Sequence, residues 1–204
     1  KNETLQPPLY PTDDSFVYLN DGISDSRLTP INDISRTYRR IAGRRMIHKQ
    51  LSYGSTLGNL ELRKTLVNYL NETRGLHISV DNILITRGSQ MGIYLAAKLL
   101  LKEADKVIVG HTNYAAATTT FINHNARVLT VPVDDYGLDT NAVELLCMKH
   151  KIKALYVTSH HHHPTTVTLS AERRIHLLNL AKAYNFALIE DDYDYDFNYN
   201  HAPI

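Results

Sequence analysis

The chain has 204 residues, 43% of them hydrophobic, a size and composition that suit one substantial core of a globular protein. It contains no apolar run of the roughly 18 residues that a membrane span needs. Basic residues number 22 and acidic residues 21, so bulk electrostatics argue against nucleic-acid binding by this chain. The single cysteine, Cys147, excludes a disulfide framework and a cysteine-based zinc site, and the absence of a signal-peptide pattern agrees with a cytoplasmic setting.

The first 50 residues differ in character from the rest. Residues 1–30 are rich in Pro, Asp and Ser and are predicted to be extended or looped, with one apolar patch at residues 16–19. Residues 32–50 are predicted to form a helix with a basic surface, for which a solvated face is favoured over an inter-subunit or nucleic-acid contact. The chain starts at Lys1 rather than Met, and we expect it to be a piece of a longer protein.

From residue 52 onward the pattern becomes regular. Residues 52–58 are a turn-rich link, Asn59 is expected to cap the next helix, and Gly75 is expected to end it. Five β-prone runs follow, at residues 83–86, 106–110, 127–132, 154–158 and 187–191. Helical stretches separate most of them, at residues 90–101, 115–124, 141–149 and 171–184, the last capped by Ser170. This alternation predicts an α/β fold with a mainly parallel sheet and helices on both faces.

The first candidate site is the sequence Gly88-Ser89-Gln90, which lies between a predicted strand and an apolar helix. Free backbone N–H groups and the positive end of the helix would favour a phosphate there, and the Ser89 hydroxyl could add a hydrogen bond. An ordinary tight turn explains the same pattern. The spacing matches neither a P-loop nor a dinucleotide fingerprint.

Two further candidates follow later strands. Tyr114 comes after the second β-prone run, where an aromatic ring could lie on a planar ligand or simply pack in the core. Residues 160–163 are four consecutive histidines, which suggest a metal site only weakly, because alternate side chains of an extended segment point to opposite faces.

The last β-prone run ends in a group of acids interleaved with Tyr193 and Tyr195: Glu190, Asp191, Asp192, Asp194 and Asp196. A solvated acidic loop is the simplest interpretation, and a calcium or magnesium site is disfavoured by the two bulky tyrosines. Taken in chain order, however, a phosphate site, an aromatic ring and an acid at a later strand end fit pyridoxal 5'-phosphate. Its ring nitrogen is usually kept protonated by an aspartate.

The sequence resembles the aminotransferase-like domain of MocR/GabR-type bacterial regulators, in the fold-type I pyridoxal-phosphate superfamily. The resemblance begins near Phe16 and continues to the end of the chain. It rests on these segments: 53–58 (YGSTLG), 60–63 (LELR), 74–75 (RG), 86–90 (TRGSQ), 131–134 (VPVD) with 137–138 (GL), 158–170 before the two arginines 173–174, and 190–194 (EDDYD).

The resemblance implies a role for each site residue. Gly88, Ser89 and Gln90 would hold the phosphate, and Tyr114 would stack on the pyridine ring. Asp191 would pair with the ring nitrogen, and Tyr193 would hydrogen-bond the phenolic oxygen. Tyr53 would reach the phosphate of a neighbouring subunit, which implies a homodimer. Residues 1–50 would be an N-terminal extension and helix, and residues 51–204 a partial pyridoxal-phosphate-binding large domain.

The chain also departs from the family pattern. The family loop reads His-Gln-Phe-Pro-Thr-Gly, whereas this chain has His161-His-His-Pro-Thr-Thr166, and His163 stands where aminotransferases have an asparagine. No lysine lies in the Ser-x-Ser-Lys-like segment that carries the Schiff-base lysine in the family. We therefore expect that lysine beyond Ile204, and expect this chain alone to be inactive in transamination.

The resemblance implies an effector-sensing domain of a GntR/MocR-family regulator. It would bind a small amino compound, and DNA would be contacted only by an N-terminal winged-helix domain absent from this chain. The alternative is a catalytic aminotransferase acting on an amino acid and a 2-oxo acid, which the same residues would serve. A third hypothesis, a metal hydrolase built on the histidines and acids, predicts a bound divalent metal.

Overall fold

A computed structural model describes residues 25–44 and 47–197, and the chain divides into two compact units, residues 1–54 and 55–204. The first unit contains a short 3-10 helix, η1 (Ser26–Leu28), and the helices α1 (Ile31–Ala42) and α2 (Ile47–Gln50). The continuous helix predicted for residues 32–50 is wrong. Gly43, a poor helix former, follows α1, and its N–H bonds to the carbonyl of Arg39. The apolar patch predicted at 16–19 lies outside the described residues.

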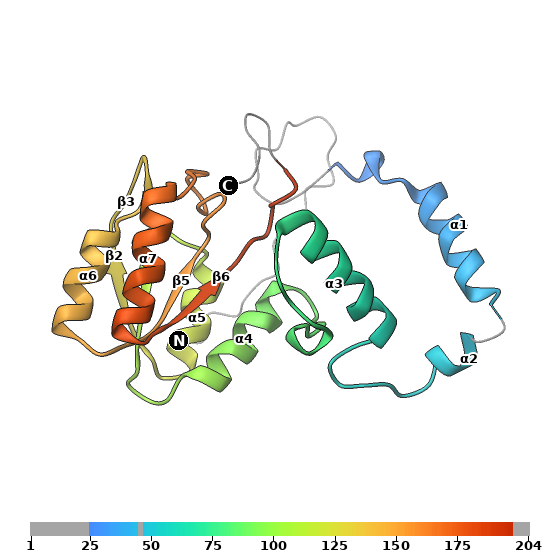
Figure 1. The fold of residues 1–204 in the computed structure, drawn as a ribbon, viewed down its shortest axis with the longest axis horizontal. Helices are drawn as coiled ribbons and strands as arrows, with labels where there is room; N and C mark the ends of the chain where they lie inside the picture. Colours follow the sequence, from blue (N-terminus) through green and yellow to red (C-terminus); the bar gives the residue numbers. More distant parts are fainter. Residues whose placement is uncertain (1–24, 45–46, 198–204) are drawn as a thin grey trace, which may run out of the picture. The chain divides into compact units, whose positions relative to one another are not determined.

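The second unit contains a four-stranded sheet in the order β2-β1-β5-β6, with every neighbouring pair parallel. Its strands are β1 (Lys106–Gly110), β2 (Arg127–Val131), β5 (Ile152–Val157) and β6 (Ala187–Glu190), drawn as arrows in Figure 1. The mainly parallel sheet predicted from the sequence is confirmed. The strand predicted at residues 83–86 is wrong, because no strand of the described chain pairs with that segment.

Alternating side chains of the strands face two different helix layers. Ile108 packs with α6 (Thr140–Lys149) and α7 (Ala171–Tyr184), while Val107 and Val109 pack with α4 (Ser89–Leu100) and α5 (Ala115–Asn123). Figure 1 shows these pairs of helices on either side of the strands. Both faces of the sheet are therefore covered, as expected for parallel strands.

The helix boundaries follow from caps that the sequence predicts. In α3 (Leu60–Arg74), the Asn59 side chain accepts a hydrogen bond from Leu62 N at 3.1 Å, and Gly75 ends the helix in a left-handed conformation. Ser170 caps α7 by accepting from Arg173 N. A short 3-10 helix, η2 (Val80–Asn82), follows α3. Among the described residues, the helices are too short or too polar to cross a bilayer.

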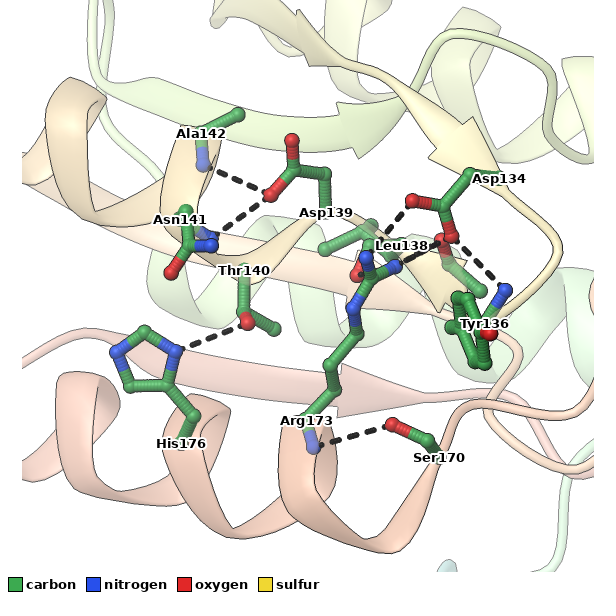
Figure 2. A network of polar contacts seen from close by, with 11 residues as sticks. Asp134, Tyr136, Leu138, Asp139, Thr140, Asn141, Ala142, Ser170, Arg173 and His176 are labelled. Atoms are coloured by element: carbon green, nitrogen blue, oxygen red, sulfur yellow. Dashed lines mark hydrogen bonds and ion pairs between the residues drawn. The ribbon is translucent and has the colours of Figure 1, made fainter.

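A short antiparallel hairpin, β3 (Val133–Asp134) with β4 (Gly137–Leu138), leads into α6 and was not predicted. Figure 2 shows how Arg173 on α7 holds it: Nη1 and Nη2 each donate to an oxygen of Asp134 at 2.7 Å, and Nη1 also donates to Gly137 O at 2.8 Å. The arginine holds the pKa of the Asp134 carboxyl below its usual value, so the pair is ionised at neutral pH. The contact joins the hairpin to α7 on the face away from α4 and α5.

Candidate functional site

The carboxyl ends of three neighbouring strands meet at one edge of the sheet. From β1 the chain passes to β2 on one side, and then to β5 on the other side of β1. The loops that follow β1 and β5 therefore diverge, and in parallel α/β sheets such a switch of direction opens a crevice where ligands bind. Tyr114 follows β1, the histidine run follows β5, and Asp191 follows β6. Three stretches predicted separately thus share one edge.

Asp191 is fixed at both its backbone and its side chain. Its N–H donates to Val157 O at 3.0 Å, which continues the β5–β6 ladder by one residue. Its Oδ2 accepts a hydrogen bond from the phenol of Tyr156 at 2.9 Å. Tyr156 was missed at the sequence level because an aromatic residue inside a strand is normally part of the core. Its side chain is indeed only 1% exposed, yet its hydroxyl reaches the edge of the sheet.

The other acids of this stretch are engaged elsewhere. Asp192 accepts from Arg74 Nη1 at 2.7 Å, and Asp194 lies 2.5 Å from His161 Nδ1. Burial raises the pKa of Asp192, and the positive charge of Arg74 opposes this shift. Glu190 accepts a hydrogen bond from the Ser159 hydroxyl. Each of these carboxylates therefore stabilises the strand end, which separates their role from that of Asp191.

The N-terminus of α4 carries the predicted phosphate residues. Gly88 precedes the helix with φ 79° and ψ 172°, and a Cβ at this position would meet no other atom within 4 Å. The N–H groups of the first helical turn, which starts at Ser89, have no intrahelical acceptor. The Gln90 side chain instead donates to Thr120 Oγ1 on α5 at 2.6 Å, so Gln90 can offer a phosphate its backbone N–H. The hydrogen bond from the Gln90 side chain holds the start of α4 against α5. Tyr114 is the residue directly before α5.

The aromatic residues meet around His163. The Tyr114 ring lies edge-to-face against the His163 imidazole with ring centres 5.8 Å apart, and Tyr193 lies edge-to-face on the same imidazole at 6.5 Å. Tyr114 is half-buried, whereas Tyr193 is exposed over half of its surface. The structure therefore brings together Tyr114, His163 and Tyr193, which are far apart in the sequence.

The four histidines alternate in burial but do not form an extended segment, because the backbone bends at His160 and His161, whose ring centres lie 4.3 Å apart. His160 and His162 are buried, whereas His161 and His163 are partly exposed. His162 Nε2 lies 2.8 Å from Thr112 O, and burial lowers the pKa of its imidazole. In the part of the chain that the structure describes, no three His, Cys, Asp or Glu side chains are placed to hold a metal ion. The four histidines lie in the loop between β5 and α7.

Tyr53 belongs to the first unit, where its side chain is fully exposed. The remaining predicted site residues all belong to the second unit. The role of Tyr53 stays a prediction about a neighbouring subunit.

The chemistry of this edge suits a flat, phosphorylated and basic molecule. A helix N-terminus with an open glycine favours a phosphate, Tyr114 offers an aromatic surface, and Asp191 offers a carboxylate that can meet a cation. The residues present therefore fit pyridoxal 5'-phosphate, which combines these features. The fold is an α/β domain with a parallel sheet, and the residues predicted to bind a phosphorylated cofactor include Tyr114 and Asp191 at the carboxyl ends of its strands.

Comparisons with known proteins agree. The family model for aminotransferase class I and II matches residues 20–202, and the chain belongs to this family. The chain is 29% identical over 159 residues to an aromatic-amino-acid aminotransferase of Thermococcus litoralis, covering 76% of this chain and 38% of that protein. It is 31% identical over 157 residues to the HTH-type transcriptional regulator TauR of Rhodobacter capsulatus, covering 77% of this chain and 31% of that protein.

Solved structures show the same fold. The kynurenine aminotransferase of Pyrococcus horikoshii, solved with PMP, matches with a TM-score of 0.79 and 32% identity, over 85% of this chain and 44% of that one. The α-aminoadipate aminotransferase LysN of Thermus thermophilus matches with a TM-score of 0.77 and 25% identity, over 88% of this chain and 44% of that one. The chain thus spans less than half the length of these relatives. It is an aminotransferase-like domain whose relatives include both MocR-type regulators and aminotransferases.

Proposed function

We propose that this chain is the pyridoxal-5'-phosphate-binding, effector-sensing part of a MocR/GabR-type transcriptional regulator. The cofactor proposal is supported by two observations: Gln90 at the start of α4 bonds to Thr120 on the helix that Tyr114 precedes, and Tyr114 and Asp191 follow strands of the same parallel sheet. The regulator proposal is supported by relatives that include TauR and the probable rhizopine catabolism regulatory protein MocR.

Each site residue has a stated task in this proposal. The backbone N–H groups at Gly88, Ser89 and Gln90 bind the phosphate, and Tyr114 supports the ring. Asp191 accepts a hydrogen bond from the protonated ring nitrogen, and Tyr193 donates one to the phenolic oxygen.

When bound, the cofactor supplies an aldehyde that combines with amines and a ring that withdraws electrons. The lysine that anchors it would come from residues outside this chain. The ligand exchanged at that aldehyde would be a small amino compound, acting as the effector.

The assembly proposed is a cytoplasmic homodimer, with DNA contacted by a winged-helix domain outside this chain. In the second unit, large apolar side chains are exposed on α3 and α4, which supports a buried interface there in the whole protein. They are Leu60, Leu62, Tyr69, Met91 and Tyr94. The nearly neutral charge of the chain agrees with DNA contact elsewhere.

Binding of pyridoxamine 5'-phosphate tests the site without requiring the lysine. We expect saturable binding in calorimetry, and we expect Asp191→Ala to weaken it roughly ten- to hundredfold because a charge-assisted hydrogen bond is lost. Asp135→Ala, which removes an exposed acid in the β3–β4 turn, is the matched control and should bind as the unsubstituted chain does. Equal affinities of the two variants would contradict the site.

A catalytic aminotransferase is the second candidate, favoured by the likeness to the archaeal aminotransferases. The two functions can be distinguished by the domains that the whole gene encodes and by whether the whole protein catalyses amino-group transfer. A winged-helix domain encoded before Lys1 and DNA binding that changes with an amino compound support the regulator. Steady transfer of an amino group from an amino acid to a 2-oxo acid by the whole protein supports the enzyme.

A further inference from the structure

We infer that Tyr156 is a positioning residue for the cofactor, whose phenol holds the Asp191 carboxylate in line with the ring nitrogen. The inference rests on the proposed function, because it concerns the residue that would meet that nitrogen. It adds a residue that neither the sequence patterns nor the family motifs single out.

The two residues are joined across neighbouring strands. Tyr156 lies on β5 opposite Ile189 of β6, and Asp191 lies two residues beyond Ile189. The tyrosine hydroxyl spans this offset and donates to Asp191 Oδ2 at 2.9 Å. The backbone bond from Asp191 N to Val157 O fixes the other end of the aspartate, so both its backbone and its carboxylate are tied to β5.

The tyrosine itself is rigid. Its ring is buried between the sheet and the layer of α4 and α5, and it meets Phe121 edge-to-face with ring centres 6.0 Å apart. Burial raises the pKa of the Tyr156 phenol, and the negative charge of Asp191 raises it further. The phenol therefore keeps its proton and acts as the donor, and Asp191 acts as the acceptor.

One hydrogen bond leaves the carboxylate with capacity for a second. An ionised carboxylate has about four acceptor positions on its two oxygens, and the phenol occupies one on Oδ2. The remaining positions can meet a protonated ring nitrogen. Without the phenol the carboxylate could rotate out of line, which would weaken a directional N–H···O contact.

A purely structural role is the competing explanation, since a buried tyrosine hydroxyl needs an acceptor in any case. The two explanations differ in what the Tyr156→Phe variant changes. A structural role predicts lower stability alone. A positioning role predicts that the protonation of the bound ring nitrogen changes, and that the change requires Asp191.

The test uses pyridoxamine 5'-phosphate labelled with nitrogen-15 in the ring. Affinity is measured by calorimetry, and ring-nitrogen protonation by its chemical shift across a pH series. Four forms of the whole protein that carries this chain are compared: the unsubstituted protein, Tyr156→Phe, Asp191→Ala and the double variant. Tyr184→Phe, a partly exposed tyrosine at the end of α7, is the matched control, and thermal melts establish that each variant folds.

We expect Tyr156→Phe to weaken binding roughly fivefold to twentyfold, less than Asp191→Ala does, because the carboxylate stays but is no longer held in line. The pH at which the bound ring nitrogen loses its proton should move toward that of the free ligand. In the Asp191→Ala background the same substitution should change affinity less than about twofold, because the two residues act as one unit.

Three results would overturn the assignment. In the first, Tyr156→Phe leaves the affinity and the chemical shift of the ring nitrogen unchanged while Asp191→Ala binds weakly. This result would reject the positioning role of Tyr156 and leave the proposed site intact. In the second, Tyr156→Phe reduces the affinity equally in the unsubstituted protein and in Asp191→Ala. This result would show that Tyr156 acts independently of Asp191. Binding by Asp191→Ala that equals that of the unsubstituted chain would overturn the proposed site itself, and this assignment with it.

Discussion

At the scale of single residues, the acids after β6 show how similar side chains take different tasks. Asp192 and Asp194 meet Arg74 and His161, which are distant in the sequence, whereas Asp191 meets a phenol at the sheet edge. The sequence indicated Asp191 through its place at a strand end and through the family motif. Its partner Tyr156 could not be predicted, because a hydrogen bond between strands depends on their register, and no local pattern encodes it.

His162 provides a pH-dependent prediction. Burial lowers the pKa of its imidazole, so the folded chain resists a proton that the unfolded chain accepts below about pH 6.5. The contribution of His162 to stability is therefore complete above that pH and is lost as the pH falls through it. In urea unfolding at pH 7.5 and 5.5, His162→Gln should reduce the loss of stability between the two pH values.

The control is His77→Gln, which changes an exposed histidine before η2. It should leave the difference between the two pH values as it is in the unsubstituted chain. A pH dependence in His162→Gln equal to that of the control would contradict the effect of burial at His162.

At the scale of elements, the caps and the alternation of strands and helices were predictable because they are local. Asn59, Gly75 and Ser170 act at the helix ends where the sequence placed them. The segment 83–86 has a strand-like composition, but a strand needs a neighbouring strand. Its backbone bonds run instead from Ile83 N to Val80 O and from Ile85 N to Leu57 O, and neither acceptor lies in a strand. The β3–β4 hairpin was missed although Asp134 and Gly137 flank a two-residue turn, a usable signal.

Replacing two glycines at the start of α4 with alanine should change the free energy of unfolding in opposite directions. Gly88 has φ 79° and ψ 172°, a region that is essentially restricted to glycine, so Gly88→Ala should lower the free energy of unfolding by about 1–3 kcal/mol. Gly92 lies inside the same helix, and a Cβ there would make an ordinary contact, 3.8 Å from Thr86 Oγ1. Gly92→Ala should therefore stabilise the chain by about 0.5–1 kcal/mol.

Chemical denaturation of both variants measures the two effects, with Gly92→Ala as the matched control for the gain of one methyl group. Equal changes of the same sign would contradict the backbone conformation at Gly88. The phosphate proposal adds that Gly88→Ala should also weaken pyridoxamine 5'-phosphate binding, since the side chain would enter the open space beside the helix start.

At the scale of the whole molecule, the layered α/β fold follows from the alternating pattern and is shared with aminotransferases. The chain spans less than half the length of those relatives, and we propose that the lysine that anchors the cofactor lies outside it. The sequence could not decide between regulator and enzyme, because the residues proposed to hold the cofactor would serve both.

The most direct test adds pyridoxal 5'-phosphate to the whole protein that carries this chain and its lysine, and records the visible absorbance. The account predicts a violet band in the unsubstituted protein and in Asp135→Ala, and a weaker or displaced band in Asp191→Ala. No violet band, or a band that Asp191→Ala leaves unchanged, would contradict the assignment of the sheet edge as the cofactor site.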